Sequence, residues 1–392
     1  MKKFLKTLMV VMLSIIVGIS VVACGNGDGK DNGEKGLLCN KIKDVYTIEK
    51  YVDEGKGITT LDIGAELEKI AEKYGEEITN VRIKAGAFNS NDTLKAIIVP
   101  STVTEIDKGA FEGMKKLEEL TVPFIGKTAY ADVFVGETVD DPKDDKEKST
   151  DSERTIAHFF GASAYNEAAA ISIKYGTNEN QAVTCHIPAT LEKITIKPQG
   201  EYKIPACAFN GFNMPTEIVF DGNITEIGAY AFANNTQLSE IELPASVTKI
   251  HDGAFSGATR LDSVNFASLT ALSEIGESAF SGTALTEIVV PSTVKVIGNN
   301  AFEGAKVTKV TLSAQIEKIG NYAFYNCAKL TKVYVADTVT TLTIGVYAFG
   351  DCEKLTYFGT EANESANPNK AMVKTFTVGA NAFDGADLTI AE

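Results

Sequence analysis

Residues 239–261, Ser-Glu-Ile-Glu-Leu-Pro-Ala-Ser-Val-Thr-Lys-Ile-His-Asp-Gly-Ala-Phe-Ser-Gly-Ala-Thr-Arg-Leu, hold a complete copy of a unit that recurs along the chain. An Ala-Phe pair marks each copy, and successive pairs are 23, 98, 23, 23, 25, 22, 22, 25 and 34 residues apart. Such regular spacing is typical of a repeat architecture. The phenylalanines of these pairs are Phe88, Phe111, Phe209, Phe232, Phe255, Phe280, Phe302, Phe324, Phe349 and Phe383.

Each unit also carries two apolar residues at alternate positions, such as Ile241 and Leu243, which predict a short strand with one apolar face. One unit is too small to close a core, but stacked units can, with neighbouring strands about 4.8 Å apart. The sequence therefore predicts a repeat solenoid, mainly β, with short irregular or helical turns and a parallel sheet along one face. Phenylalanine would fill the middle of each coil.

A glycine often precedes the pair in the pattern Ile-Gly-x-x-Ala-Phe, as at Gly276 and Gly298. Another copy has Pro205 at the same place, and the proline ring holds φ near −65°. If all copies share one backbone, φ is negative there. We therefore predict that glycine is favoured at this position for tight space, not for a left-handed backbone.

The unit Leu-x-x-Ile-x-(Leu/Val)-Pro-x-x-Val-x-x-Ile-Gly-x-x-Ala-Phe-x-Gly resembles the BspA-type leucine-rich repeat, found in many bacterial surface lipoproteins and in some parasite surface proteins. The resemblance covers about residues 80–392, with one gap. Family members are often described as adhesins or host-protein binders, which implies a binding role without catalysis. The repeat positions are core positions and do not identify a ligand.

The first residues form a predicted leader. Lys2, Lys3 and Lys6 precede an apolar run over residues 8–23, which is shorter than a membrane span of about 20 residues and fits a signal peptide. Val-Val-Ala before Cys24 resembles a bacterial lipobox, whose cysteine receives a diacylglycerol before cleavage. We predict lipidation at Cys24 and an extracytoplasmic, membrane-anchored chain at the cell surface. The alternative is an uncleaved anchor at the amino terminus.

The predicted organisation follows from these signals. A signal peptide over 1–23 precedes a flexible tether over 24–50, and 51–79 form a cap whose apolar Leu61, Leu67 and Ile70 have near-helical spacing. The first repeats cover 80–123, an insertion covers 124–184, and the main array covers 185–392. Residues 140–154 of the insertion lack apolar side chains and predict a solvated loop, whereas 156–161 could pack back on the coils. The insertion is either part of a binding face or a decorative loop.

Five cysteines remain besides Cys24, and an odd number cannot all pair within one chain. Cys327 and Cys352 each follow a repeat phenylalanine by three residues. Stacking would bring them within range of a disulfide, although geometry could still forbid it. Two buried thiols in a small core slot are the favoured alternative.

No catalytic motif accompanies the repeats, and neither a cofactor nor a metal site is expected. The chain has three histidines, and the patterns H-E-x-x-H, G-x-S-x-G and C-x-x-C do not occur. His158 and His251 are expected to be structural. With 37 basic and 52 acidic residues the formal charge is −15, which argues against nucleic acid as a partner.

Alternation places a column of side chains on the outer face of the sheet, and solenoids use such extended faces for binding. We expect exposed Ile98, Val219, Val289 and Tyr334 to be its main apolar residues. The polar members of the predicted column are Glu119, Thr121, Glu217, Glu240, Glu242, Asn265, Glu287, Lys309 and Lys332. A merely solvated sheet is the other interpretation.

The sequence thus favours a lipid-anchored surface protein that binds a macromolecule, either a host or envelope protein or a glycan. A structural or assembly scaffold of the cell envelope is the second hypothesis. An enzyme that uses the 124–184 insertion is the third and the weakest.

Overall fold

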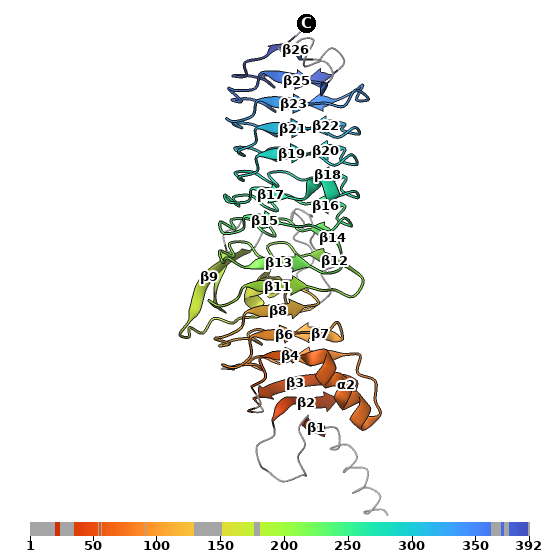
Figure 1. Cartoon of the computed structure of the whole chain (residues 1–392), viewed down its shortest axis with the longest axis vertical. Coiled ribbons are helices and arrows are strands. Elements are labelled where there is room, and N and C mark those ends of the chain that lie inside the picture. Colours follow the sequence, from red (N-terminus) through yellow and green to blue (C-terminus); the bar gives the residue numbers. More distant parts are fainter. Residues whose placement is uncertain are drawn as a thin grey trace, which may run out of the picture. The chain divides into compact units, whose positions relative to one another are not determined.

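The computed structural model describes residues 20–23, 35–53, 55, 57–89, 91–128, 151–175, 181–361, 370–371 and 376–390. The chain divides into two compact units. Unit 1 comprises Met1–Ala129, Ala157–Ala170 and Cys185–Ile194, and unit 2 comprises Tyr130–Ile156, Ile171–Thr184 and Thr195–Glu392. Both units are built mainly from coils whose strands pair in parallel, which confirms the predicted solenoid class (Figure 1).

The strands of the amino-terminal half are short. They are β1 (Ser20–Ala23), β2 (Gly36–Ile42), β3 (Val45–Val52), β4 (Thr60–Asp62), β5 (Val81–Ile83), β6 (Ala96–Ile98), β7 (Val103–Ile106) and β8 (Glu119–Val122). Two 3-10 turns, η1 (Asp151–Arg154) and η2 (Ile156–His158), precede β9 (Ala168–Tyr175), β10 (Gln181–Pro188) and β11 (Lys193–Ile196). In unit 1, β2 pairs antiparallel with β3, whereas β3, β5 and β7 pair in parallel.

Coil stacking in unit 1 begins earlier than the sequence predicted. Alternate residues of β2 and β3 are buried, among them Leu37 and Ile48. The Tyr51 amide donates to the carbonyl of Ala87 over 2.8 Å, and the Tyr51 ring stacks on Phe88 with centroids 6.2 Å apart. Tyr51 therefore serves as the aromatic residue of a first coil without an Ala-Phe pair. The prediction of a flexible tether is wrong for residues 36–50, because these strands bury apolar side chains.

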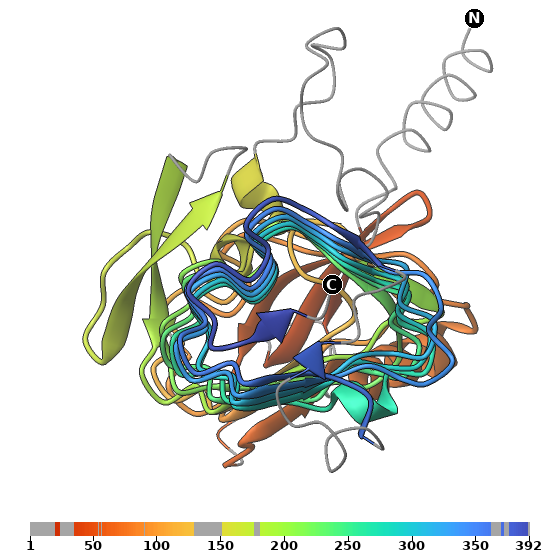
Figure 2. The ribbon, with the colours of Figure 1, turned by 90° about the horizontal axis from the view of Figure 1, so that it is seen from above.

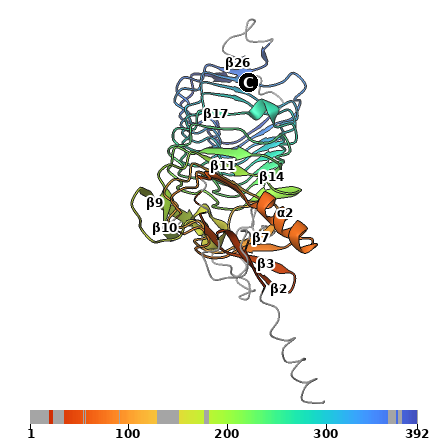
Figure 3. The same ribbon diagram turned by 60° about the horizontal axis from the view of Figure 1, so that its bottom comes forward.

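The predicted helix over the first coils is α2 (Ile63–Tyr74), which lies beside the first strands of unit 1 (Figure 3). Asp62 caps its amino end by accepting a hydrogen bond from the Ala65 amide, and Gly75 ends it with φ of 65°. Ile63, Leu67 and Ile70 are buried on one face. The amphipathic spacing predicted a helix here, but Leu61 lies buried on β4 before the helix, whose first buried residue is Ile63.

The segment after the charged loop packs back on unit 1, as the sequence suggested. The Gly109 amide donates to the His158 carbonyl over 2.8 Å, and the Phe111 amide donates to the Phe159 carbonyl over 3.0 Å. Phe159 and Phe160 are fully buried. This segment therefore occupies the place of an Ala-Phe pair in the ladder, and the insertion is interrupted by a piece of coil. Residues 140–150 lie outside the described residues.

Unit 2 has parallel strand pairing on two sides of its coils where the sequence predicted one sheet, and its coils superpose in the view of Figure 2. One ladder runs through β12 (Glu201–Ile204), β14 (Asn223–Ile227), β16 (Lys249–Ile250), β18 (Glu274–Ile275), β20 (Val296–Ile297), β22 (Lys318–Ile319), β24 (Thr343–Ile344) and β27 (Thr377–Val378). The other side carries β13 (Glu217–Phe220), β15 (Glu240–Ile241), β17 (Ser263–Val264), β19 (Glu287–Val289), β21 (Lys309–Thr311), β23 (Lys332–Tyr334) and β25 (Tyr357–Gly359). The remaining elements are η3 (Phe266–Ser268), β26 (Lys370–Ala371) and β28 (Thr389–Ile390).

Phenylalanine stacking forms the core of unit 2. From Phe209 to Phe383, neighbouring rings of the Ala-Phe pairs lie 5.1–5.4 Å apart with planes within 8° of each other. From Phe209 to Phe349, each of these phenylalanine amides donates to the alanine carbonyl of the next coil, as Phe302 does to Ala323 over 2.7 Å. Ring stacking and backbone hydrogen bonds thus both join each coil to the next.

The glycine prediction is confirmed. The glycine before the pair does not have positive φ, and a Cβ on Gly320 would lie 2.5 Å from the Asn299 nitrogen. The left-handed residue is instead the one directly before Ala-Phe, for example Asn300 with φ of 53° and Tyr322 with φ of 56°. Glycine, asparagine, serine, cysteine and tyrosine all occupy this place in different coils.

Candidate binding surface

The predicted sheet column exists in unit 2 as two in-register rows. Glu287, Lys309 and Lys332 are direct neighbours across β19, β21 and β23, and Val289, Thr311 and Tyr334 form the parallel row. Strand alternation turns these side chains away from the core residues between them. Within the first row, Lys309 pairs with Glu287 over 3.0 Å.

Tyr334 is not exposed, and that part of the predicted site is wrong. Only 8% of Tyr334 is accessible, because its ring packs on Tyr357 with centroids 5.8 Å apart and Lys309 Nζ lies 5.5 Å from its centre. The Tyr357 hydroxyl donates to the Thr360 carbonyl over 2.5 Å, and Gly359 leaves room for the ring. The last coils therefore cover this end of the row.

The other predicted residues of the unit 2 column differ in exposure. Val289 is 46% exposed, and Glu240, Glu242, Glu287 and Glu217 are exposed, whereas Val219 is half-buried. Asn265 is already engaged, because its side chain bonds both the amide and the carbonyl of Leu243 at 2.9 Å. The accessible part of this face is therefore acidic, with Val289 as its most exposed apolar residue.

Unit 1 presents its own short version of the column. Ile98 on β6 lies beside Thr121 on β8, and Ala96 lies beside Glu119. Glu119 is exposed, but Ile98 and Thr121 are half-buried. Ile98 was predicted to be exposed but is only partly accessible, since neighbouring strands cover it.

Charges on the second ladder of unit 2 pair with one another. Lys203 lies 2.7 Å from Glu226, Lys249 lies 3.2 Å from Glu274, and His251 Nε2 lies 2.6 Å from Glu226. Burial lowers the pKa of His251 more than its hydrogen bond to Glu226 raises it. Burial also acts to raise the pKa of Glu226, but the bonds from Lys203 and His251 outweigh it and hold that pKa below its usual value.

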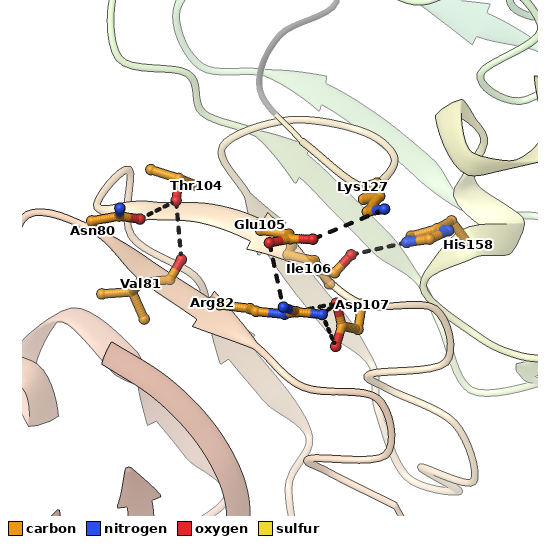
Figure 4. Close-up of polar contacts among 9 residues, drawn as sticks. All are labelled: Asn80, Val81, Arg82, Thr104, Glu105, Ile106, Asp107, Lys127 and His158. Carbon is orange, nitrogen blue, oxygen red and sulfur yellow. Dashed lines mark hydrogen bonds and ion pairs between the residues drawn. The ribbon is translucent and has the colours of Figure 1, made fainter. Parts of the chain in front are cut away.

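A polar network ties the first coils of unit 1 together (Figure 4). Arg82 binds both carboxylate oxygens of Asp107, at 2.7 and 2.9 Å, and lies 3.7 Å from Glu105. These bonds to Asp107 are the main reason that the pKa of Arg82 is raised. His158 donates through Nε2 to the carbonyl of Ile106 over 2.9 Å and is buried. The network joins neighbouring coils, and His158 is structural as predicted.

Sequence reasoning missed a cluster of tyrosines on the turns of unit 2. The rings of Tyr322 and Tyr347 stack with centroids 5.4 Å apart and planes 11° apart, and Tyr325 meets both edge-on at 5.4 and 6.4 Å. Tyr322 is 36% exposed, and the other two are half-buried. Aligning the coils on their Ala-Phe pairs would have revealed the cluster, because Tyr322 and Tyr347 share one repeat position.

The described cysteines are buried free thiols. Cys327 and Cys352 donate to the carbonyls of Phe302 and Phe324 over 3.2 and 3.1 Å. The neighbouring Cys352 thiol, together with burial, raises the pKa of Cys327. Near the insertion, burial raises the pKa of Cys185 to about 12. Reactive cysteines have low pKa values and are accessible, so Cys185 is unsuited to act as a nucleophile.

Cys24, the predicted lipidation site, lies outside the described residues. Among the helices that the structure describes, none combines the length and the apolar character that a membrane crossing requires.

Comparisons with known proteins identify the repeat. A family model described as "BspA type Leucine rich repeat region (6 copies)" matches residues 81–136, 185–306 and 273–375. No curated protein matches the chain.

Several solved structures are similar. A leucine-rich repeat protein from Bacteroides ovatus is 17% identical, with 91% of this chain and 92% of that chain covered and a TM-score of 0.38. A leucine rich cell surface protein from Faecalibacterium prausnitzii is 22% identical over 74% of this chain and 65% of that chain, with a TM-score of 0.30. The pneumococcal vaccine antigen PcpA is 16% identical over 87% and 73%, with a TM-score of 0.33. Because the family model matches well over half of its 392 residues, the chain belongs to the BspA-type leucine-rich repeat family.

Proposed function

We propose that this chain is a lipid-anchored surface protein that binds a macromolecule through the sheet face of unit 2 and catalyses no reaction. The observation that carries the proposal is the in-register row of outward residues on β19, β21 and β23, with Val289 46% exposed on the same strand as Glu287, which pairs with Lys309. Extended solenoid faces of this kind serve as binding surfaces, and membership of a family with surface proteins supports the same role.

The partner of this face is proposed to be a host or envelope protein or a glycan, held without a cofactor. Apolar anchors surrounded by polar residues contribute most to such interfaces, so Val289 is the residue to test first. Glu240, Glu242 and Glu287 would set the electrostatic character of the face and with it the rate of association.

A binding screen with matched variants tests the proposal. The full-length chain in mild detergent is presented to host matrix proteins and envelope fractions, and Val289→Asp is compared with Val378→Asp. Val378 is 38% exposed but lies on β27 of the other ladder, which makes it the control. We expect Val289→Asp alone to abolish capture. Capture that survives this change refutes the sheet face, and capture lost only on deletion of 140–154 assigns binding to the insertion.

A further inference from the structure

We propose that the turns of unit 2 form a second binding surface, whose tyrosine cluster takes an arginine-containing segment of a protein partner. We define the turn ridge as residues 228–234, 251–257, 276–282, 298–304, 320–326, 345–351 and 379–385, and the tyrosine cluster as Tyr322, Tyr325 and Tyr347. The ridge is distinct from both ladders, so this site is separate from the sheet face proposed above.

The charge of the turn ridge selects a cationic partner. Its seven turns contain Asp252, Glu277, Glu303, Asp351 and Asp384 and no lysine or arginine. The histidine of the ridge, His251, is buried against Glu226. Lysines lie on the ladders, for example Lys318 and Lys332, and on the segments that follow the turns, for example Lys329 and Lys354. A surface with one sign of charge attracts the opposite sign and speeds its association.

The tyrosine cluster adds aromatic faces to this charge. The Asp351 carboxylate acts on the Tyr325 hydroxyl and raises the pKa of Tyr325, and Glu303 acts on it in the same direction. A planar guanidinium binds carboxylates through its N–H groups and stacks on aromatic rings, which an ammonium group does less well. Partly exposed rings beside carboxylates therefore favour arginine over lysine and over an uncharged sugar.

The cluster is held in place by its surroundings. Gly350 is buried, and a Cβ there would lie 2.9 Å from Tyr347 Cδ1 and 3.1 Å from Tyr325 Cδ2. Asn381 Nδ2 donates to the Tyr347 hydroxyl over 2.7 Å. Other coils have Glu303, Tyr325 or Asp384 at the place of Gly350. Rings that are already ordered lose little conformational entropy on binding.

The residues found at the same repeat position in other coils show which substitutions preserve the backbone conformation. Asn300 and Asn381 occupy the left-handed position of Tyr322 and Tyr347 in other coils, with φ of 53° and 56°. The double variant Tyr322→Asn/Tyr347→Asn therefore removes two rings without a new backbone demand. Tyr230→Asn is the matched control, because Tyr230 has the same repeat position, with φ of 54°, but lies outside the cluster.

The experiment measures binding of a fluorescein-labelled Arg-Gly repeat peptide to the full-length chain in mild detergent. The same peptide with citrulline in place of arginine tests the need for charge, and cellohexaose tests for a glycan site. We expect the arginine peptide alone to bind and the double variant to bind it at least about fivefold more weakly. Tyr230→Asn should bind as the parent chain does.

A second variant keeps the proposal testable if the double tyrosine variant misfolds. Asp351→Asn places asparagine where Asn326 and Asn234 already occur, with the same positive φ. It should weaken peptide binding at low salt, and the difference should vanish at high salt. Equal binding of the citrulline peptide, displacement by cellohexaose, or unchanged binding by both the double variant and Asp351→Asn would each overturn the proposal and leave the sheet face unaffected.

Discussion

Gly350 lies directly against Tyr347, so closely that a Cβ at position 350 would be 2.9 Å from the Tyr347 ring. Tyr347 and Tyr325 could not adopt their edge-on contact of 6.4 Å if this position carried a larger side chain. One glycine thus permits an aromatic surface feature between two coils.

Gly350→Ala tests this relationship. Gly350 does not have positive φ, so steric overlap with the two rings is the expected cost. We expect the variant to fold, with a free energy of unfolding lower by about 1–3 kcal/mol and a changed tyrosine signal in near-ultraviolet circular dichroism. Ala328→Gly is the control, because it changes an exposed residue outside the tyrosine cluster. Gly304→Ala is unsuitable, since Gly304 has φ of 65°. An unaltered spectrum would contradict the role of Gly350.

The pH dependence of stability should reveal His251. Its pKa is lowered in the folded protein, so the unfolded chain takes up a proton first as the pH falls. The contribution of His251 to the stability of the folded protein is complete above about pH 6.5. It is lost as the pH falls from there to the pKa of His251 in the folded protein. Melting temperatures between neutral and acidic pH measure this slope. His251→Gln, which cannot titrate, should show a smaller slope than the parent chain. Identical slopes would show that His251 does not contribute.

The lowered pKa of Glu226 gives a second, more acidic transition. A carboxylate with a lowered folded pKa stabilises the fold above its unfolded pKa, and this contribution is lost as the pH falls through the folded value. In Glu226→Gln the bonds from Lys203 and His251 lose their charged acceptor. We expect this variant to be less stable at neutral pH and to lose less stability below about pH 4.5. Lys197→Gln, which alters an exposed pair with Asp221, is the control.

The cysteines should be unreactive while the chain is folded. Cys39, Cys185, Cys207, Cys327 and Cys352 are all buried, and the pKa values of Cys185 and Cys327 are raised. Iodoacetamide should leave all five unmodified in the native chain and modify all five after unfolding without reductant. Intact mass spectrometry gives the count. Modification of only three in the unfolded chain, rising to five with reductant, would establish a disulfide, with Cys327 and Cys352 as the expected pair.

Lipidation at Cys24 is tested by metabolic labelling with a fatty acid. We expect label in the parent chain and none in Cys24→Ala, because the lipobox cysteine is the acceptor. Cys39→Ala, which changes another cysteine near the amino terminus, should retain the label. Equal labelling of Cys24→Ala and the parent chain would refute the lipid anchor.

The sequence by itself determined the repeat and its core. Ala-Phe pairs at nearly constant spacing place one ring per coil, so the stack from Phe209 to Phe383 follows from periodicity alone. Pro205 correctly predicted that φ is negative at the repeat glycine, because the two residues occupy the same repeat position and the coils share one backbone. The alternation of residues correctly predicted that Val289 points outward, since the side-chain direction in a strand depends only on local geometry.

Only the tertiary structure decided what covers these outward residues. Tyr334 has the same strand phase as Val289, yet Tyr357 of the next coil buries it. Likewise Tyr51 begins the stack without an Ala-Phe pair, because strand pairing with the following coil takes the place of the motif. The tyrosine cluster depends on contacts between residues 22 or more positions apart and on Gly350. Periodicity fixes the direction of a side chain, whereas the size of its neighbours in the next coil fixes its exposure.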